Sequence, residues 1–168
     1  MKHVILIGFM GAGKTSVGKR LASHLKLSFT DTDDLIVQEQ HMPVNQIFET
    51  YGEPYFRELE TEMLKKLLQE EKRMVISVGG GLPMTAKNQP LFKELGQVVY
   101  LQASVDTLME RLKRDTSRPL LKGGDLRKKI TGLMEAREAT YEKVADIRIR
   151  TDKKSFSEIV LEISEKIS

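Results

Sequence analysis

Residues 8–15 have the sequence Gly8-Phe-Met-Gly-Ala-Gly-Lys-Thr15, which matches the phosphate-loop pattern G-x4-G-K-[ST]. The apolar run at residues 4–7 predicts a strand before it, and a helix is predicted after it, which is the context that the motif requires. In such a loop, backbone N–H groups surround phosphate oxygens, the lysine reaches the outer phosphates, and the hydroxyl group can coordinate magnesium. A plain glycine-rich turn would not account for strand, glycines, lysine, hydroxyl and helix in this order. The predicted nucleotide-binding residues are Gly11, Ala12, Gly13, Lys14, Thr15 and Ser16.

Strand and helix signals alternate along the rest of the chain. The predicted strands are residues 4–7, a short stretch around Phe29, and residues 74–78, 98–101 and 147–151. Helical periodicity predicts helices over 105–112 and 156–167, the second behind a capping box of Ser155 and Glu158. This alternation predicts an α/β fold, a three-layer α/β/α sandwich in which helices cover both faces of a parallel sheet.

The composition is that of one globular domain spanning 1–168. The chain has 168 residues, of which 40% are apolar and 30% are charged. It has no cysteine, which excludes a disulfide framework, a thiolate zinc site and a cysteine nucleophile. No apolar run is long enough to span a membrane, and no export signal precedes the phosphate loop. We therefore expect a cytoplasmic protein with no membrane partner.

The net charge of +3 arises from one short segment. Residues 111–129 hold eight Lys and Arg residues and two Asp residues, which gives this segment a net charge of +6. The rest of the chain holds the other 19 of the 27 basic residues and 22 of the 24 acidic residues, so its net charge is −3. A nucleic-acid-binding protein would spread its positive charge along a face, so the cluster indicates a small polyanion instead. Arg111 and Arg118 are predicted to fold over nucleotide phosphates and base, and a solvated basic loop is the alternative.

Asp31 and Asp33 follow the predicted second strand. Carboxylates at such a position are often helix N-caps or turn formers, and this alternative stays open. If the strand lies beside the phosphate loop, strand alternation would point both side chains the same way. One could then hold a magnesium-bound water while the other meets a substrate hydroxyl.

Three adjacent glycines, Gly79, Gly80 and Gly81, directly follow the predicted third strand. Such a run costs backbone entropy, so we expect it to serve the close approach of a ligand. A tight exit from the strand is the alternative.

Two arginines are candidates for binding an anionic substrate. Arg57 lies at a predicted helix start with Glu60 three residues on, where a solvated helical arginine is the alternative. Arg137 shares the inward-facing helical stripe of Ile130 and Tyr141, where a cation needs an anionic partner. A snorkelling or internally paired arginine would also explain Arg137.

Taken together, the motifs resemble those of the shikimate kinases, small members of the nucleoside-monophosphate-kinase-like phosphate-loop fold. The resemblance covers nearly the whole chain. It implies a five-stranded parallel sheet in the order 2-3-1-4-5, a substrate-binding region over about 31–60 and a lid over about 112–125. The motifs are residues 8–15, Phe-Thr-Asp-Thr-Asp at 29–33, Gly-Glu-x-x-Phe-Arg-x-x-Glu at 52–60, the triple glycine, Arg-Pro-Leu-Leu at 118–121, and Arg137 with Tyr141.

The resemblance also implies an activity, which is ATP-dependent phosphorylation of the 3-hydroxyl of shikimate in aromatic amino acid biosynthesis. Asp33 would bind and activate the hydroxyl, Arg57 and Arg137 would bind the carboxylate, and residues 79–81 would contact the ring hydroxyls. A kinase for another hydroxy acid such as gluconate, or a non-catalytic nucleotide-dependent binding module, remains an alternative.

On the nucleotide side, the resemblance implies that Arg111 stacks on adenine and that Arg118 approaches the transferred phosphate. Lys14 and Arg118 would join Asp33 as catalytic residues, while Thr15 and Asp31 would act on Mg²⁺. The expected partners are ATP and shikimate alone, bound by a monomer that contacts no nucleic acid.

Overall fold

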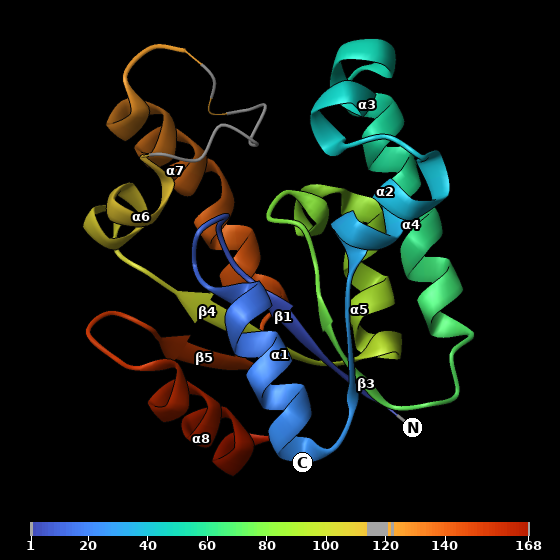
Figure 1. Ribbon diagram of the computed structural model, residues 1–168, viewed down its shortest axis with the longest axis vertical. Helices are drawn as coiled ribbons and strands as arrows, with labels where there is room; N and C mark the ends of the chain where they lie inside the picture. Colours follow the sequence, from blue (N-terminus) through green and yellow to red (C-terminus); the bar gives the residue numbers. More distant parts are fainter. Residues whose placement is uncertain (1, 114–120, 122, 168) are drawn as a thin grey trace.

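A computed structural model describes residues 2–113, 121 and 123–167. At its centre is a sheet of five parallel strands in the order β2-β3-β1-β4-β5 (Figure 1). The strands are β1 (His3–Ile7), β2 (Ser28–Asp31), β3 (Met74–Ser77), β4 (Gly96–Gln102) and β5 (Ile147–Arg150). The predicted parallel sheet and its strand order are therefore confirmed.

Helices cover both faces of the sheet (Figure 1). The predicted capping box of Ser155 and Glu158 is present at the start of the last helix. The helices are α1 (Lys14–Leu25), α2 (Thr32–Gln40), α3 (Val44–Tyr51), α4 (Glu53–Leu68), α5 (Gln89–Leu95), α6 (Val105–Leu112), α7 (Leu126–Val144) and α8 (Phe156–Lys166), with short 3-10 turns η1 (Leu82–Met84) and η2 (Ala86–Asn88).

Strand alternation in β1 divides the core into two clusters. Val4 and Leu6 pack on one face with residues of α1, α6 and α8, whereas Ile5 and Ile7 pack on the other face with residues of α2 to α5. All four side chains are fully buried, and burying each stabilises the fold by roughly 1.5–3 kcal/mol. Helix α7 contributes to both clusters, which places its buried stripe at the boundary between them.

The parallel register brings three chain segments to the same edge of the sheet. Ser77 at the end of β3 pairs with Leu6 of β1 on one side and with Asp31 of β2 on the other. The phosphate loop, the start of α2 and the glycine segment 79–81 all follow these strand ends. In the sheet, β1 lies between β3 and β4. The strand order therefore reverses its direction at β1, and the phosphate loop follows this strand. Such a reversal point is the usual position of a ligand in an open parallel sheet.

Residues 31–60 form the last residue of β2, the helices α2 and α3 and the start of α4, with breaks at Pro43 and Gly52. Pro43 is the N-cap of α3, because its fixed φ suits a helix start and it cannot continue the preceding helix. Gly52 separates α3 from α4 with a φ of 86°, in the region that favours glycine.

The predicted lid lies between α6 and α7, and residues 114–120 and 122, including Arg118, are outside the described residues. Within the described part of the chain, no helix is both long and apolar enough to cross a membrane.

Candidate active site

The phosphate loop forms one wall of a cavity of about 340 Å³ at the carboxyl edge of the sheet. Gly13, with a φ of 95°, turns the chain into α1, and Lys14 folds back so that Nζ donates hydrogen bonds to Gly8 O (2.6 Å) and Phe9 O (3.0 Å). Among the predicted nucleotide-binding residues, Ala12 does not line the cavity, because its side chain is buried in the core. The residues that do are Gly11, Gly13, Lys14, Thr15, Ser16 and Arg111.

Asp31 and Asp33 both line this cavity. They do not lie on one face of a strand, as strand alternation predicted. Asp31 ends β2 and is the N-cap of α2, where Oδ1 accepts hydrogen bonds from the N–H groups of Asp33 (2.9 Å) and Asp34 (3.3 Å). Asp33 therefore lies in the first turn of a helix. The N-cap alternative is correct for Asp31, whose Oδ2 also accepts a hydrogen bond from Thr15 Oγ1 (3.5 Å).

A second, smaller cavity of about 50 Å³ adjoins the first. It contains Asp33, both predicted arginines and the whole glycine segment, so the structure brings these residues together. The cavity residues are Met10, Asp33, Val44, Phe48, Phe56, Arg57, Glu60, Gly79, Gly80, Gly81 and Arg137.

The three glycines allow side chains to approach the backbone closely. A Cβ on Gly79 would lie 2.9 Å from Asp33 Oδ1, and a Cβ on Gly81 would lie 2.5 Å from Arg57 Nη2. None of the three has a positive φ, so glycine is required here by space rather than by backbone conformation. The protein's own side chains therefore approach the glycines closely, and a bulkier residue would push Asp33 or Arg57 out of the cavity. The close approach of a ligand stays a prediction.

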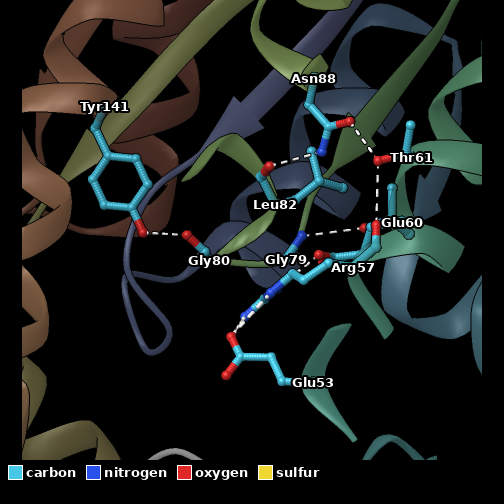
Figure 2. A network of polar contacts seen from close by, with 10 residues as sticks. Glu53, Arg57, Glu60, Thr61, Gly79, Gly80, Leu82, Asn88 and Tyr141 are labelled. Carbon is cyan, nitrogen blue, oxygen red and sulfur yellow. Dashed lines mark hydrogen bonds and ion pairs between the residues drawn. The ribbon is translucent and has the colours of Figure 1, made fainter. Parts of the chain in front are cut away.

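The two arginines differ in whether an acidic side chain of the described residues forms an ion pair with the guanidinium group. Arg57 binds Glu53 (3.0 Å) and Glu60 (2.7 Å), so it is not the solvated arginine of the alternative hypothesis (Figure 2). Arg137 is 5% exposed, and its guanidinium lies 5.7 Å from the centre of the Phe9 ring. Its Nη1 is buried without a hydrogen-bond partner among the described residues, which is costly for a charged group. Arg137 is therefore the better-placed cation for an anion that enters the cavity.

Glu60 is a fully buried carboxyl group in the same cavity. Burial raises its pKa to about 7, although the neighbouring Arg57 opposes this effect, and the charge of Asp33 raises the pKa further. The folded protein therefore binds this proton more tightly than the unfolded chain does. Its contribution to stability is complete below the unfolded pKa of 4.5 and is lost as the pH rises through about 7.

We accordingly expect Glu60→Gln to flatten the pH dependence of stability. Between pH 5 and 8 the free energy of unfolding of the unmodified protein should fall relative to that of the variant, by on the order of 3 kcal/mol. Urea unfolding at several pH values measures this difference. Glu58→Gln, an exposed neighbour on α4 that pairs with Lys87, is the matched control. Parallel curves for the unmodified protein and Glu60→Gln would contradict the assignment.

Arg111 and Phe156 also line the first cavity, close to Gly13 of the phosphate loop. Arg111 Nη1 donates a hydrogen bond to Gly11 O (2.9 Å), which attaches the end of α6 to the phosphate loop. The sequence predicted Phe156 only as the first residue of the helix over 156–167, because helical periodicity gives no sign that this residue reaches a cavity.

Ser77 was also missed as a cavity residue. Its Oγ is buried, has no hydrogen-bond partner among the described residues, and belongs to a side chain that lines the first cavity. Its place as the polar last residue of the buried strand β3, beside the strand that precedes the phosphate loop, is the signal that would have found it.

Comparisons with known proteins agree with this geometry. The family model for shikimate kinase matches residues 10–168. The shikimate kinase of Sulfurihydrogenibium sp. (strain YO3AOP1) is 46% identical over 167 residues, which cover 99% of this chain and 98% of that protein. Shikimate kinase from Acinetobacter baumannii in complex with shikimate has a TM-score of 0.93 and 34% identity, covering 100% of this chain and 96% of that chain. A gluconokinase from Sinorhizobium meliloti 1021 shares the fold, with a TM-score of 0.63, 18% identity and coverage of 96% and 88%. The chain therefore belongs to the shikimate kinase family.

Proposed function

We propose that this protein transfers the γ-phosphoryl group of ATP to the 3-hydroxyl of shikimate, giving shikimate 3-phosphate and ADP. In this reaction the hydroxyl oxygen forms a bond to the γ-phosphorus while the bond to the β–γ bridging oxygen breaks. The hydroxyl proton passes to Asp33. This step places the protein in the shikimate pathway to aromatic amino acids.

The observation that carries this proposal is the junction of the two cavities. Met10, Asp33, Gly79 and Gly80 line both of them. A triphosphate bound by the phosphate loop would thus meet, at Asp33, an alcohol bound in the second cavity. Phosphoryl transfer depends mainly on positioning, and a misplacement of about 1 Å can cost on the order of a hundredfold in rate.

The second cavity suits a small carboxylic acid. Arg57 and Arg137 present two guanidinium groups, and the carboxylates of Glu53 and Glu60 bind only the first of them. Arg137, whose Nη1 has no hydrogen-bond partner among the described residues, would attract the substrate carboxylate, while Asp33 would accept a hydrogen bond from a hydroxyl. A cavity that offers both a cation and a carboxylate favours a molecule that carries both an acid and an alcohol.

The first cavity suits Mg²⁺ bound with a nucleotide. Thr15 Oγ1, Asp31 Oδ2 and the unpartnered Ser77 Oγ are hard oxygen donors, which match the preference of this ion. Mg²⁺ usually keeps several waters and is bound by one or two protein oxygens together with substrate phosphates. We propose that Thr15 and Asp31 hold the ion, which would neutralise charge on the phosphate oxygens.

The remaining positive charge comes from the chain itself. Lys14 and Arg111 both line the first cavity. We propose that Lys14 contacts the outer phosphates and that Arg111 stacks on the adenine base. Arg118, which lies outside the described residues, is proposed as a further phosphate ligand on the resemblance of the motif at 118–121 alone. The proposed partners are the two small-molecule substrates, bound by a cytoplasmic monomer.

ADP release across a panel of hydroxy acids tests the proposal. Shikimate should support turnover, and gluconate and quinate should support little, with phosphorus NMR placing the new phosphate on the 3-oxygen of shikimate. Preferential turnover of gluconate would favour a kinase for that acid. Slow ATP hydrolysis that no acid stimulates would instead favour a nucleotide-dependent binding module.

Arg137→Ala is expected to raise the KM for shikimate by about 10- to 100-fold, because a charge-assisted contact to the carboxylate is lost. The KM for ATP should change little, since Arg137 does not line the first cavity. Arg127→Ala removes an exposed arginine of the same helix and is the matched control. Equal effects of Arg137→Ala on both substrates would argue against its role in acceptor binding.

A further inference from the structure

Tyr141 connects α7 to the glycine segment. Its ring is fully buried, and its hydroxyl donates a hydrogen bond to Gly80 O (2.5 Å; Figure 2). The neighbouring carbonyls are bound by the backbone, because Gly79 O accepts from Leu82 N (3.1 Å) and Gly81 O accepts from Met84 N (3.0 Å). The middle carbonyl of the segment is thus held by a side chain from a helix 61 residues further along the chain.

Gly80 lies between the phosphate loop and Arg137. A Cβ on Gly80 would lie 3.2 Å from Arg137 Nη1, 3.3 Å from Met10 N and 3.4 Å from Gly8 O. Arg137 and Tyr141 are four residues apart, on the same face of α7. A shift of Gly80 would therefore change its spacing to Arg137, which lines the second cavity but not the first.

We propose that Tyr141 is a positioning residue for the acceptor: its hydroxyl holds the Gly80 carbonyl and thereby fixes the glycine segment relative to Arg137. This inference rests on the proposed function. The residue does not need to touch the substrate to do this. It acts by setting the width of the second cavity, in which Gly80 and Arg137 both take part.

The surroundings of Tyr141 suit this role. Burial raises the pKa of Tyr141 to about 12, so the hydroxyl keeps its proton and remains a donor at neutral pH. The ring packs against that of Tyr100 on β4, with the ring centres 5.1 Å apart. The contact with Tyr100 therefore holds the Tyr141 ring against the sheet, and the Tyr141 hydroxyl in turn holds the glycine segment.

The test compares Tyr141→Phe with Tyr100→Phe. Each variant removes one hydroxyl from the same buried ring pair, but only the first removes the bond to Gly80. We expect Tyr141→Phe to raise the KM and the dissociation constant for shikimate by about tenfold, with less than a twofold change for ATP. Tyr100→Phe should leave both substrates unchanged. The ratio of kcat/KM for shikimate to that for quinate should also fall in Tyr141→Phe alone.

These readouts separate positioning from stability. A KM and a ratio of two substrates do not depend on how much of the enzyme is folded, so a merely destabilised Tyr141→Phe would not change them. The effect of Tyr141→Phe on shikimate affinity should also be much smaller in an Arg137→Ala background, because the two residues act on the same contact.

Unchanged shikimate constants in Tyr141→Phe, equal effects in the two tyrosine variants, or strict additivity with Arg137→Ala would overturn the inference. A failure of the unmodified protein to bind or phosphorylate shikimate would count against the proposed function instead.

Discussion

Asp33→Asn is expected to lower kcat by about 10²- to 10⁴-fold, the usual contribution of a positioned general base. Asparagine has nearly the same size and keeps the first turn of α2, so the cavities should retain their shape. It cannot, however, take up the hydroxyl proton. Because the asparagine side-chain oxygen can still accept a hydrogen bond from the acceptor hydroxyl, the variant should lose proton transfer rather than the binding of either substrate. Rapid-mixing measurements of ADP formation give kcat, and calorimetry gives the two dissociation constants.

Asp34→Asn is the matched control for Asp33→Asn. Asp34 follows directly in α2, is exposed, and lines neither of the two cavities. Its replacement should leave kcat within about twofold, as for most surface substitutions. If Asp33→Asn retained more than a tenth of the normal kcat, proton transfer to this carboxylate would not be part of the rate-limiting chemistry. Asp33 would then serve only to bind the acceptor.

The nucleotide side of the site could be predicted from the sequence because its residues are close together in the chain. Residues 8–15 carry the phosphate loop in one continuous motif, and the strand and helix around it are set by local patterns. The strand order was implied by the resemblance, and the structure confirms it. The strand-based reason given for the placement of Asp33 was wrong, because the Asp31 side chain caps a helix that begins one residue after β2.

The acceptor side could be predicted only in part, because it is made of residues that are distant in sequence. Sequence patterns suggested Arg57, Arg137 and the glycines one at a time, each with a structural alternative. The i,i+3 spacing of Arg57 and Glu60 predicts their ion pair, and the structure confirms it. No pattern shows that Tyr141 reaches Gly80, or that Arg137 Nη1 lacks a hydrogen-bond partner among the described residues. These contacts depend on the packing of α4 and α7 against the sheet, which local periodicity does not determine.

Lys14→Met is expected to lower kcat/KM for ATP by on the order of 10²- to 10³-fold, a loss typical of removing one preorganised stabilising group. Methionine keeps most of the aliphatic length of lysine but loses the ammonium group. Two effects combine here. The phosphates lose a cation, and Gly8 O and Phe9 O lose the hydrogen bonds that Nζ donates to them at the start of the loop.

Shikimate binding distinguishes a local effect of Lys14→Met from a general loss of structure. Lys14 lines the first cavity but not the second, so calorimetry should find the affinity for shikimate within about twofold of normal, as after a distant substitution. Lys19→Met, at an exposed position of the same helix, should change neither substrate. If Lys14→Met weakened shikimate binding as strongly as ATP use, the two cavities would be coupled through the phosphate loop. Binding of one substrate would then change the affinity for the other through residues that line both cavities, such as Met10 and Gly80.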